Sequence, residues 1–272
     1  MTQNTISNRA EFEELISSAA MLSDYTYDVG LNLSGLKLKN LDFSNVVMPF
    51  LKMPAADIEG CNFDGAVMPG ADFRGGRFRR CSFLKADLTG VGLTGVKMPD
   101  TDMQEAILVG AKMVDADMTG CKLKGADLTA ANMLGASLGK ADLTMCLFVG
   151  STLVSVDFTG ANALLGQFNA AAINDADFTE ANLSHSRFEK SEMHRVCFHK
   201  ANLDSAYLEL VDAKNASFNH AKLNKAKFTR CNLDAVAFDK AKHLVTAIFQ
   251  ANKGVGGQVK RLQHSYHNQN TI

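Results

Sequence analysis

Histidine is the residue type in this sequence whose spacing comes nearest to that of a metal-binding site. His199 and His220 lie 21 residues apart, and His185 and His194 precede them in the same stretch. Imidazoles bind zinc, but structural zinc sites use four ligands and catalytic sites use three protein ligands. Because no third ligand is evident, we predict solvated histidines and no metal site. We also predict no catalytic residues, no cofactor and no enzyme activity, since no nucleophile is paired with a positioned base.

Cysteine is the second reactive residue type, and its spacing favours a structural role. Buried thiols act as compact apolar fillers and suit a reducing compartment. We therefore expect free thiols rather than a disulfide between Cys61 and Cys81, and we expect Cys197 to face outward. The other five fall at one phase of a five-residue period where small residues dominate: Cys61, Cys81, Cys121, Cys146 and Cys231.

A repeat that runs through most of the chain must position these residues. A large apolar residue stands at every fifth position from Leu33 to Phe238, at 42 positions with exceptions only at Ala163 and Ala213. Neither an α-helix nor a flat strand has a period of five, whereas a fixed repeat is typical of stacked units. The position two residues before the large one is Ala in 21 of 43 cases. The chain therefore alternates inward and outward residues, as a strand does.

Four such short sides would close a coil of about 20 residues. Coils stacked at the ~4.8 Å spacing of strands would give about ten and a half coils in a rod ~50 Å long. The turn residues agree with a corner after each large residue. Gly fills the second position after it in 13 of 26 repeats from Gly35 to Gly160, and all four prolines occupy the first: Pro49, Pro54, Pro69 and Pro99.

Several triplets make the chain resemble the pentapeptide repeat family over about four-fifths of its length. They are ADF at 71–73 and 176–178, ADL at 86–88, 126–128 and 141–143, ANM at 131–133, and ANL at 181–183 and 201–203. The resemblance implies an all-β fold, a right-handed quadrilateral β-helix whose core is filled by the large residue and the small one before it. It also implies a homodimer formed by the C-terminal element, as in relatives that protect type II topoisomerases. Here that element would comprise Leu244, Val245, Ile248 and Phe249.

We expect one domain with two caps, which would cover the unpaired strand edges at the ends of a solenoid. Residues 1–30 form the N-terminal cap, 31–242 the β-helix, and 243–272 a C-terminal cap with a flexible tail. Asn8 and Glu11 are a candidate capping pair. The N-terminal helix that they begin would carry apolar residues at helical spacing, namely Phe12, Leu15, Ile16, Ala19 and Leu22. A second short helix is expected over 244–249.

One side of the coil is predicted to expose apolar residues over six coils. A contiguous exposed apolar patch usually marks an interaction site, although β-propensity alone also selects Val and Ile on a strand surface. We interpret this side and its neighbour as a surface for a protein partner, formed by Val47, Val67, Ile107, Val109, Val114, Leu134, Leu147, Val149 and Val154. The opposite side, with Lys37, Asp57, Arg77, Lys97 and Asp117, is expected to be solvated.

Charge and hydropathy narrow the function classes. The net charge of −1, from 28 basic and 29 acidic residues, gives no field that would favour nucleic-acid binding. No apolar stretch approaches the roughly 20 residues that cross a bilayer, and the polar start lacks a secretory signal. We therefore expect a cytoplasmic bacterial protein with no membrane association.

Three functions stay open at this point. The apolar side predicts a non-enzymatic scaffold that binds a protein partner. The family resemblance implies, as alternatives, a DNA-mimicking modulator of DNA gyrase or topoisomerase IV, or a secreted bacterial effector whose export signal would lie within residues 1–30.

Overall fold

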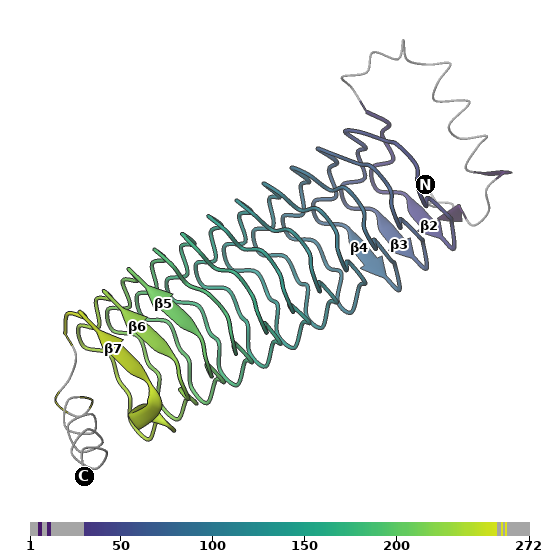
Figure 1. The fold of residues 1–272 in the computed structure, drawn as a ribbon. Coiled ribbons are helices and arrows are strands. Elements are labelled where there is room, and N and C mark those ends of the chain that lie inside the picture. The colour runs from purple at the N-terminus through teal and green to yellow at the C-terminus, as the bar shows by residue number, and fades with distance from the viewer. Residues whose placement is uncertain (1–4, 7–9, 12–29, 255–256, 258, 260–272) are drawn as a thin grey trace.

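The structure is a computed structural model that describes residues 5–6, 10–11, 30–254, 257 and 259. The chain forms an elongated rod of stacked coils (Figure 1). The rod is a β-solenoid of about 11 turns with almost no helix. Parallel bridges join residues 20 apart, from Asn32 with Lys52 to Lys222 with Lys242. The predicted four-sided coil of 20 residues is therefore confirmed.

Regular strands lie near the two ends of the rod (Figure 1). All of them pair in parallel. One sheet has the order β1 (Thr5–Ile6), β2 (Lys37–Lys39), β3 (Asp57–Glu59) and β4 (Arg77–Arg79). The other has the order β5 (Tyr207–Glu209), β6 (Lys227–Thr229) and β7 (Ile248–Gln250). The two sheets lie on different sides of the coil, and isolated bridges extend each ladder along its own side, from Arg77 with Lys97 beyond β4 and up to Arg187 with Tyr207 before β5. A 3₁₀ turn, η1 (Leu244–Thr246), precedes β7.

We name the four sides of the rod by their outward residues. Side A contains residues 47–49, side B 52–54, side C 57–59 and side D 62–64, each with its equivalents at steps of 20 along the chain. The large residue in the middle of each set points inward. Its two neighbours point outward, as strand alternation requires.

Every corner has the same left-handed backbone conformation. All 43 residues at every fifth position from 30 to 240 have positive φ, and 29 of them are not glycine. This conformation is the one that the third residue of a type II turn needs. The turn is closed by a backbone bond such as that from Ala106 N to Met103 O, 3.1 Å long.

Stacked side chains fill the interior in columns. One column in the C-terminal half consists of phenylalanine, and its successive ring centroids lie 4.4, 5.3, 4.7 and 5.3 Å apart. It comprises Phe158, Phe178, Phe198, Phe218 and Phe238. Offset stacking of this kind stabilises a core beyond the burial of apolar area. The outer walls are thus held by a continuous, close-packed interior.

The N-terminal end is covered in part by a strand. In β1, Thr5 and Ile6 pair with Lys37 and Leu38 of β2, and Ile6 is buried. Of the predicted N-terminal helix, Glu11 and its neighbour Ala10 have helical conformation. The rest of that helix, including Asn8, Phe12, Leu15, Ile16, Ala19 and Leu22, lies outside the described residues.

The short helix predicted over 244–249 is wrong. Leu244–Thr246 forms the η1 turn, and Ile248 and Phe249 belong to β7, where they pair with Lys227 and Phe228. The Phe249 ring stacks on Phe228 with centroids 4.8 Å apart. Pairing with β6 covers that strand's edge and continues the aromatic core, which a helix at this position could not do. Beyond it, Gly257 and Val259 have helical conformation and the Val259 side chain is buried.

Candidate interaction surface

All nine residues predicted to face a partner lie on the outside of the rod. The exposed fraction is 70% for Val47 and 42% for both Ile107 and Leu134. The other six are half-buried: Val67, Val109, Val114, Leu147, Val149 and Val154. Their role in binding stays a prediction.

Backbone bonds on both flanks hold these residues in place. Ile107, for example, donates its N–H to Ala86 O at 2.9 Å and accepts from Leu88 N at 2.8 Å. Its neighbours in the chain, Ala106 and Leu108, are fully buried. The side chain of Ile107 therefore has one direction available, and it points outward.

The apolar patch is not contiguous along side A, which corrects the expectation of one flat patch. Bridges place Asp87 between Val67 and Ile107, and Asp127 between Ile107 and Leu147. Val47 and Val67 lie in neighbouring coils, but from Val67 to Leu147 apolar rows and polar rows alternate from one coil to the next. A continuous column does occur on side B, where Val114, Leu134 and Val154 occupy equivalent positions in three successive coils.

Four further exposed apolar residues were not anticipated because they occupy corners. Their exposed fractions are 47, 46, 45 and 43%, for Phe50, Met145, Leu165 and Leu210 respectively. All four have positive φ, a conformation that favours glycine,. A large apolar residue at a corner position was the signal in the sequence that would have found them.

The four residues predicted to form a dimer have different environments. Leu244 is buried and Phe249 is partly buried against the core, so neither is a free contact residue. Val245 and Ile248 are exposed by 38 and 46%.

Four histidines point outward in the C-terminal half, and of these His185 is exposed while His194, His199 and His220 are half-buried. His199 and His220 come from neighbouring coils, with ring centroids 5.0 Å apart. A separate pair lies on side B, where the His194 Nε2 atom is 3.0 Å from Asp212 Oδ2. Within the described part of the chain, no group of three or more His, Cys, Asp or Glu residues could hold a metal ion.

The cysteines are free thiols, and five of the six are buried as predicted. Desolvation raises the pKa of Cys81 and of Cys121 to about 12, and that of Cys231 to about 11. Burial also raises the pKa of Cys61 and Cys146. Since the thiolate is the reactive form, these residues act as core fillers. Cys197 is half-buried on the outside, 3.4 Å from Thr179 Oγ1.

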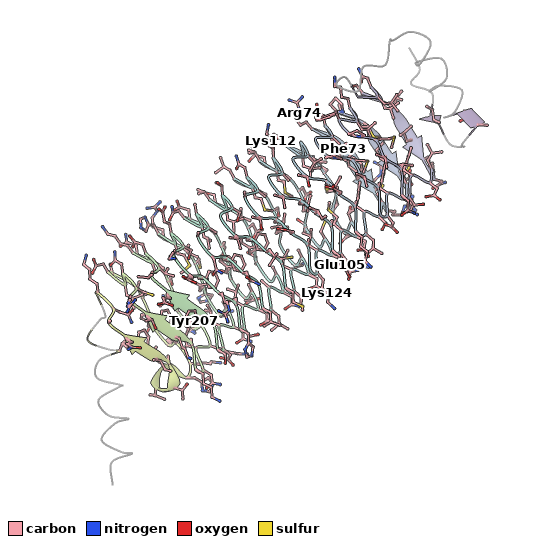
Figure 2. The ribbon with its side chains drawn as sticks, turned by 45° about the horizontal axis from the view of Figure 1, so that its top comes forward. Phe73, Arg74, Glu105, Lys112, Lys124 and Tyr207 are labelled. Atoms are coloured by element: carbon pink, nitrogen blue, oxygen red, sulfur yellow. The ribbon has the colours of Figure 1, made fainter. Side chains whose placement is uncertain are left out.

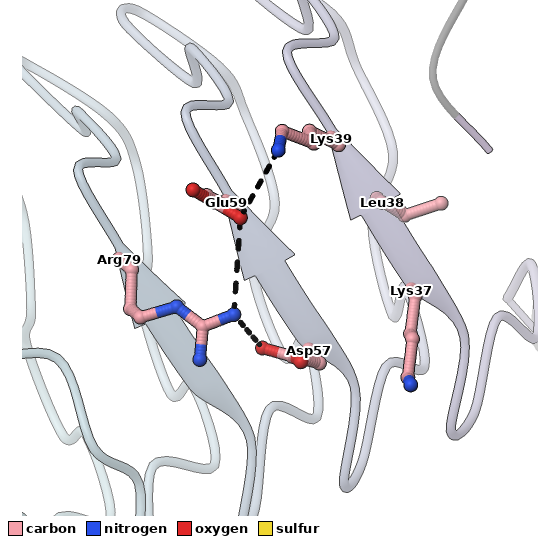
Figure 3. A pocket seen from close by; sticks show the side chains of 6 residues that line it. All are labelled: Lys37, Leu38, Lys39, Asp57, Glu59 and Arg79. Carbon is pink, nitrogen blue, oxygen red and sulfur yellow. Dashed lines mark ion pairs between the residues drawn. The ribbon is translucent and has the colours of Figure 1, made fainter. Parts of the chain in front are cut away.

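A small depression on side C is lined by five charged residues, four of which form ion pairs with one another (Figure 3). Its volume is about 150 Å³, and Leu38 forms its apolar part. Lys39 lies 3.6 Å from Glu59, and Arg79 lies 2.8 Å from Asp57. Ligand pockets are usually ~300–1,000 Å³ and mostly apolar. The depression therefore has the features of a local ion-pair network rather than of a substrate site.

Charged residues project from sides B and D as well. Figure 2 shows Arg74 and Lys112 of side B along one edge of the rod, and Lys124 of side D with Glu105, at the corner after side D, along the other. The Asp72 carboxylate accepts bonds from Arg74 Nε at 2.8 Å and Nη2 at 2.7 Å. This hydrogen-bonded guanidinium lowers the pKa of Asp72.

The family model for pentapeptide repeats matches eight copies over residues 55–83, 86–125, 121–162, 173–209, 197–234 and 214–242. These matches cover well over half of the chain. The chain belongs to the pentapeptide repeat family. Members of this family are generally non-enzymatic structural or interaction proteins.

A solved pentapeptide repeat structure shows the same fold. The chain is similar to HetL, a protein involved in heterocyst differentiation regulation in the cyanobacterium Nostoc sp. strain PCC 7120. The two share 20% identity with a TM-score of 0.51, over 89% of this chain and 93% of HetL. This likeness concerns the fold alone.

More distant matches include QnrB1, a plasmid-mediated fluoroquinolone resistance protein, with 14% identity, a TM-score of 0.35, and coverage of 84% of this chain and 97% of that one. Rfr23 of the cyanobacterium Cyanothece 51142 has 17% identity, a TM-score of 0.19, and coverage of 60 and 90%. No curated protein matches this chain. In the part of the chain that the structure describes, no helix is long and apolar enough to span a membrane.

Proposed function

We propose that this pentapeptide repeat protein is a non-enzymatic scaffold that binds a protein partner through side A, between Val67 and Val149. The exposed Ile107 is the observation that carries the proposal, because a β-branched apolar side chain is fixed on the outer wall with 42% of its surface in water. Val109, Leu147 and Val149 lie on the same side and are half-buried. A partner that covers these side chains would remove apolar surface from water, which favours binding.

Rigidity supports this use of the surface. Neighbouring coils bond to Ile107 and Leu147 through the backbone, and the large residues behind them are fully buried. A partner would therefore meet a surface that loses little conformational entropy on binding, which favours affinity.

Duplex mimicry receives less support from the charges. On side C, a column at steps of one coil runs Lys37, Asp57, Arg77, Lys97 and Asp117. A duplex mimic would present a continuous acidic surface, whereas this column carries three cations and two anions. A homodimer through the exposed Val245 and Ile248, and export as an effector, remain predictions.

The test of the scaffold proposal adds charge to side A. Ile107→Asp combined with Val149→Asp should retain the β-solenoid circular dichroism spectrum, because both positions face water. Affinity capture from the source organism should recover at least about tenfold less of any specific partner with this variant, as for loss of a central contact.

A matched control places two carboxylates elsewhere. Ser217→Asp with Asn219→Asp adds the same charge on side C and should capture the partner as the wild type does. Equal capture by the wild type and by the Ile107 and Val149 variant would contradict the proposal.

A further inference from the structure

We propose that the partner element on side A is an amphipathic α-helix that lies along the axis of the rod. Its contact face would carry an apolar residue at every seventh position, with Lys or Arg three or four residues after each one. The proposal rests on the scaffold function and specifies the chemistry of the partner.

The first observation is the alternation of one column of side A. Parallel bridges join each member to the next, in the order Val67, Asp87, Ile107, Asp127 and Leu147. Backbone bonds of 2.7 to 2.8 Å, such as those from Leu108 N to Asp127 O and from Leu128 N to Leu147 O, keep this register. Since neighbouring coils are ~4.8 Å apart, the apolar residues recur at ~9.6 Å with a carboxylate midway.

The second column of side A repeats the pattern. In the same coils it carries Pro69, Thr89, Val109, Thr129 and Val149, so whole rows alternate between apolar and polar. The partner face that fits must therefore alternate at the same step.

The two carboxylates between Val67 and Leu147, those of Asp87 and Asp127, form no ion pair within the described part of the chain. Asp87 Oδ1 accepts from Thr89 N at 3.0 Å and from Thr89 Oγ1 at 2.7 Å. Asp127 Oδ1 accepts from Thr129 N at 2.9 Å. Among the described residues, neither forms an ion pair with Lys or Arg, and neither Oδ2 atom accepts a hydrogen bond. Each row of negative charge thus lies between two apolar rows and would be complemented by a Lys or Arg of the partner.

The spacing selects an α-helix over other backbone conformations. A helix rises ~1.5 Å per residue, so residues three or four apart share a face at ~4.5–6 Å and residues seven apart recur at ~10.5 Å. A strand along the axis presents one residue per ~6.7 Å on a face. A polyproline helix presents one per ~9.3 Å. Only the helix supplies a contact residue for every coil and an apolar one for every second coil.

The corner beside these columns leaves room for such a helix. A Cβ atom built on Gly90, Gly110 or Gly150 would have no heavy atom within 4 Å. A helix ~10 Å wide can therefore extend over this edge without meeting a side chain at those three coils.

The experiment uses the full chain and three synthetic helical peptides of about 20 residues. The first has Leu at every seventh position and Lys three or four residues after each Leu. The second has Glu in place of Lys, and the third has the same composition with Leu at every sixth position. Binding is measured by fluorescence anisotropy of a labelled peptide at low and at high salt.

The Lys peptide should bind about fivefold or more tightly than the Glu peptide, as two exposed ion pairs allow, and salt should reduce the difference. The six-residue spacing should abolish binding. In the rod, Asp87→Asn with Asp127→Asn should bring the Lys and Glu peptides to within about twofold of each other. The fold should be retained, because Asn Oδ1 can still accept the bonds from Thr89 and Thr129.

Equal binding of the Lys and Glu peptides to the wild-type rod, or no binding of either, would overturn the helix proposal. Concentration-dependent dimerisation of the rod through side A, lost on Ile107→Asp, would also overturn it by assigning the surface to a second copy. The scaffold proposal is judged separately by partner capture, so a partner that binds side A without a helix would leave that function standing.

Discussion

Treatment of the folded protein with a thiol reagent at pH 8 is expected to modify one cysteine of the six. Cys197 is half-buried on the outside of the rod, whereas the other five are at most 5% exposed. The same reagent in urea should modify all six.

The magnitude follows from desolvation of the buried thiols. With the pKa of Cys81 and Cys121 raised to about 12, the thiolate fraction at pH 8 is ~10⁻⁴, compared with roughly 0.2 for an ordinary thiol. Reactivity should therefore fall by about three orders of magnitude even before access is considered. The pKa of Cys231 is raised to about 11, so this thiol should react faster than Cys81 and Cys121 but far more slowly than Cys197.

The assay follows reaction with a chromogenic disulfide and identifies the modified residue by mass spectrometry of peptides. Cys197→Ser should remove the fast phase entirely. A fast phase of two or more thiols in the native protein, or a fast phase that persists in Cys197→Ser, would refute the inward placement of the cysteine phase of the repeat.

Two stability measurements test the corners and the core. Gly30 and Gly110 share a positive φ, but a Cβ on Gly30 would lie 1.9 Å from Phe50 O while one on Gly110 meets nothing. We expect Gly110→Ala to lower the free energy of unfolding by about 1 kcal/mol, and Gly30→Ala to lower it by more. Urea denaturation measures both values, and equal losses of stability in the two variants would contradict the clash at Gly30. Phe178→Ala should cost ~3–5 kcal/mol, because its fully buried ring lies between two others at centroid distances of 4.4 and 5.3 Å; a loss below about 1 kcal/mol in the thermal or urea transition would argue against the column.

The period of five predicts most of the fold because one rule places every residue. A large residue at each centre demands a buried environment, and its two neighbours must then face outward. Positions such as Ile107 and Cys197 could therefore be placed correctly without any information about distant contacts. The stacking of Phe158 on Phe178 follows from the same 20-residue step.

The remainder depends on interactions that a repeat does not encode. All 16 corners from Leu165 to Lys240 have positive φ without a single glycine, so corner geometry is imposed by the stacked coils and not by residue preference. At the C-terminal end, Phe249 continues the aromatic core in β7, which outweighs the helical spacing of 244–249. Asp87 and Asp127 interrupt the apolar column of side A, and the sequence predicts this only when every twentieth residue is compared, polar ones included.

Because the step of 20 residues is unbroken, an insertion or deletion in this molecule determines which side of the coil every later residue occupies. Removing five residues between Ile107 and Leu147 would keep the large residues in phase and the interior filled, yet it would turn everything downstream by a quarter revolution. Leu147 would then face the direction of a neighbouring wall. Inserting or deleting one five-residue repeat thus moves every later residue to the next side of the coil. The alignment of Val67, Ile107 and Leu147 therefore depends on the number of repeats between them.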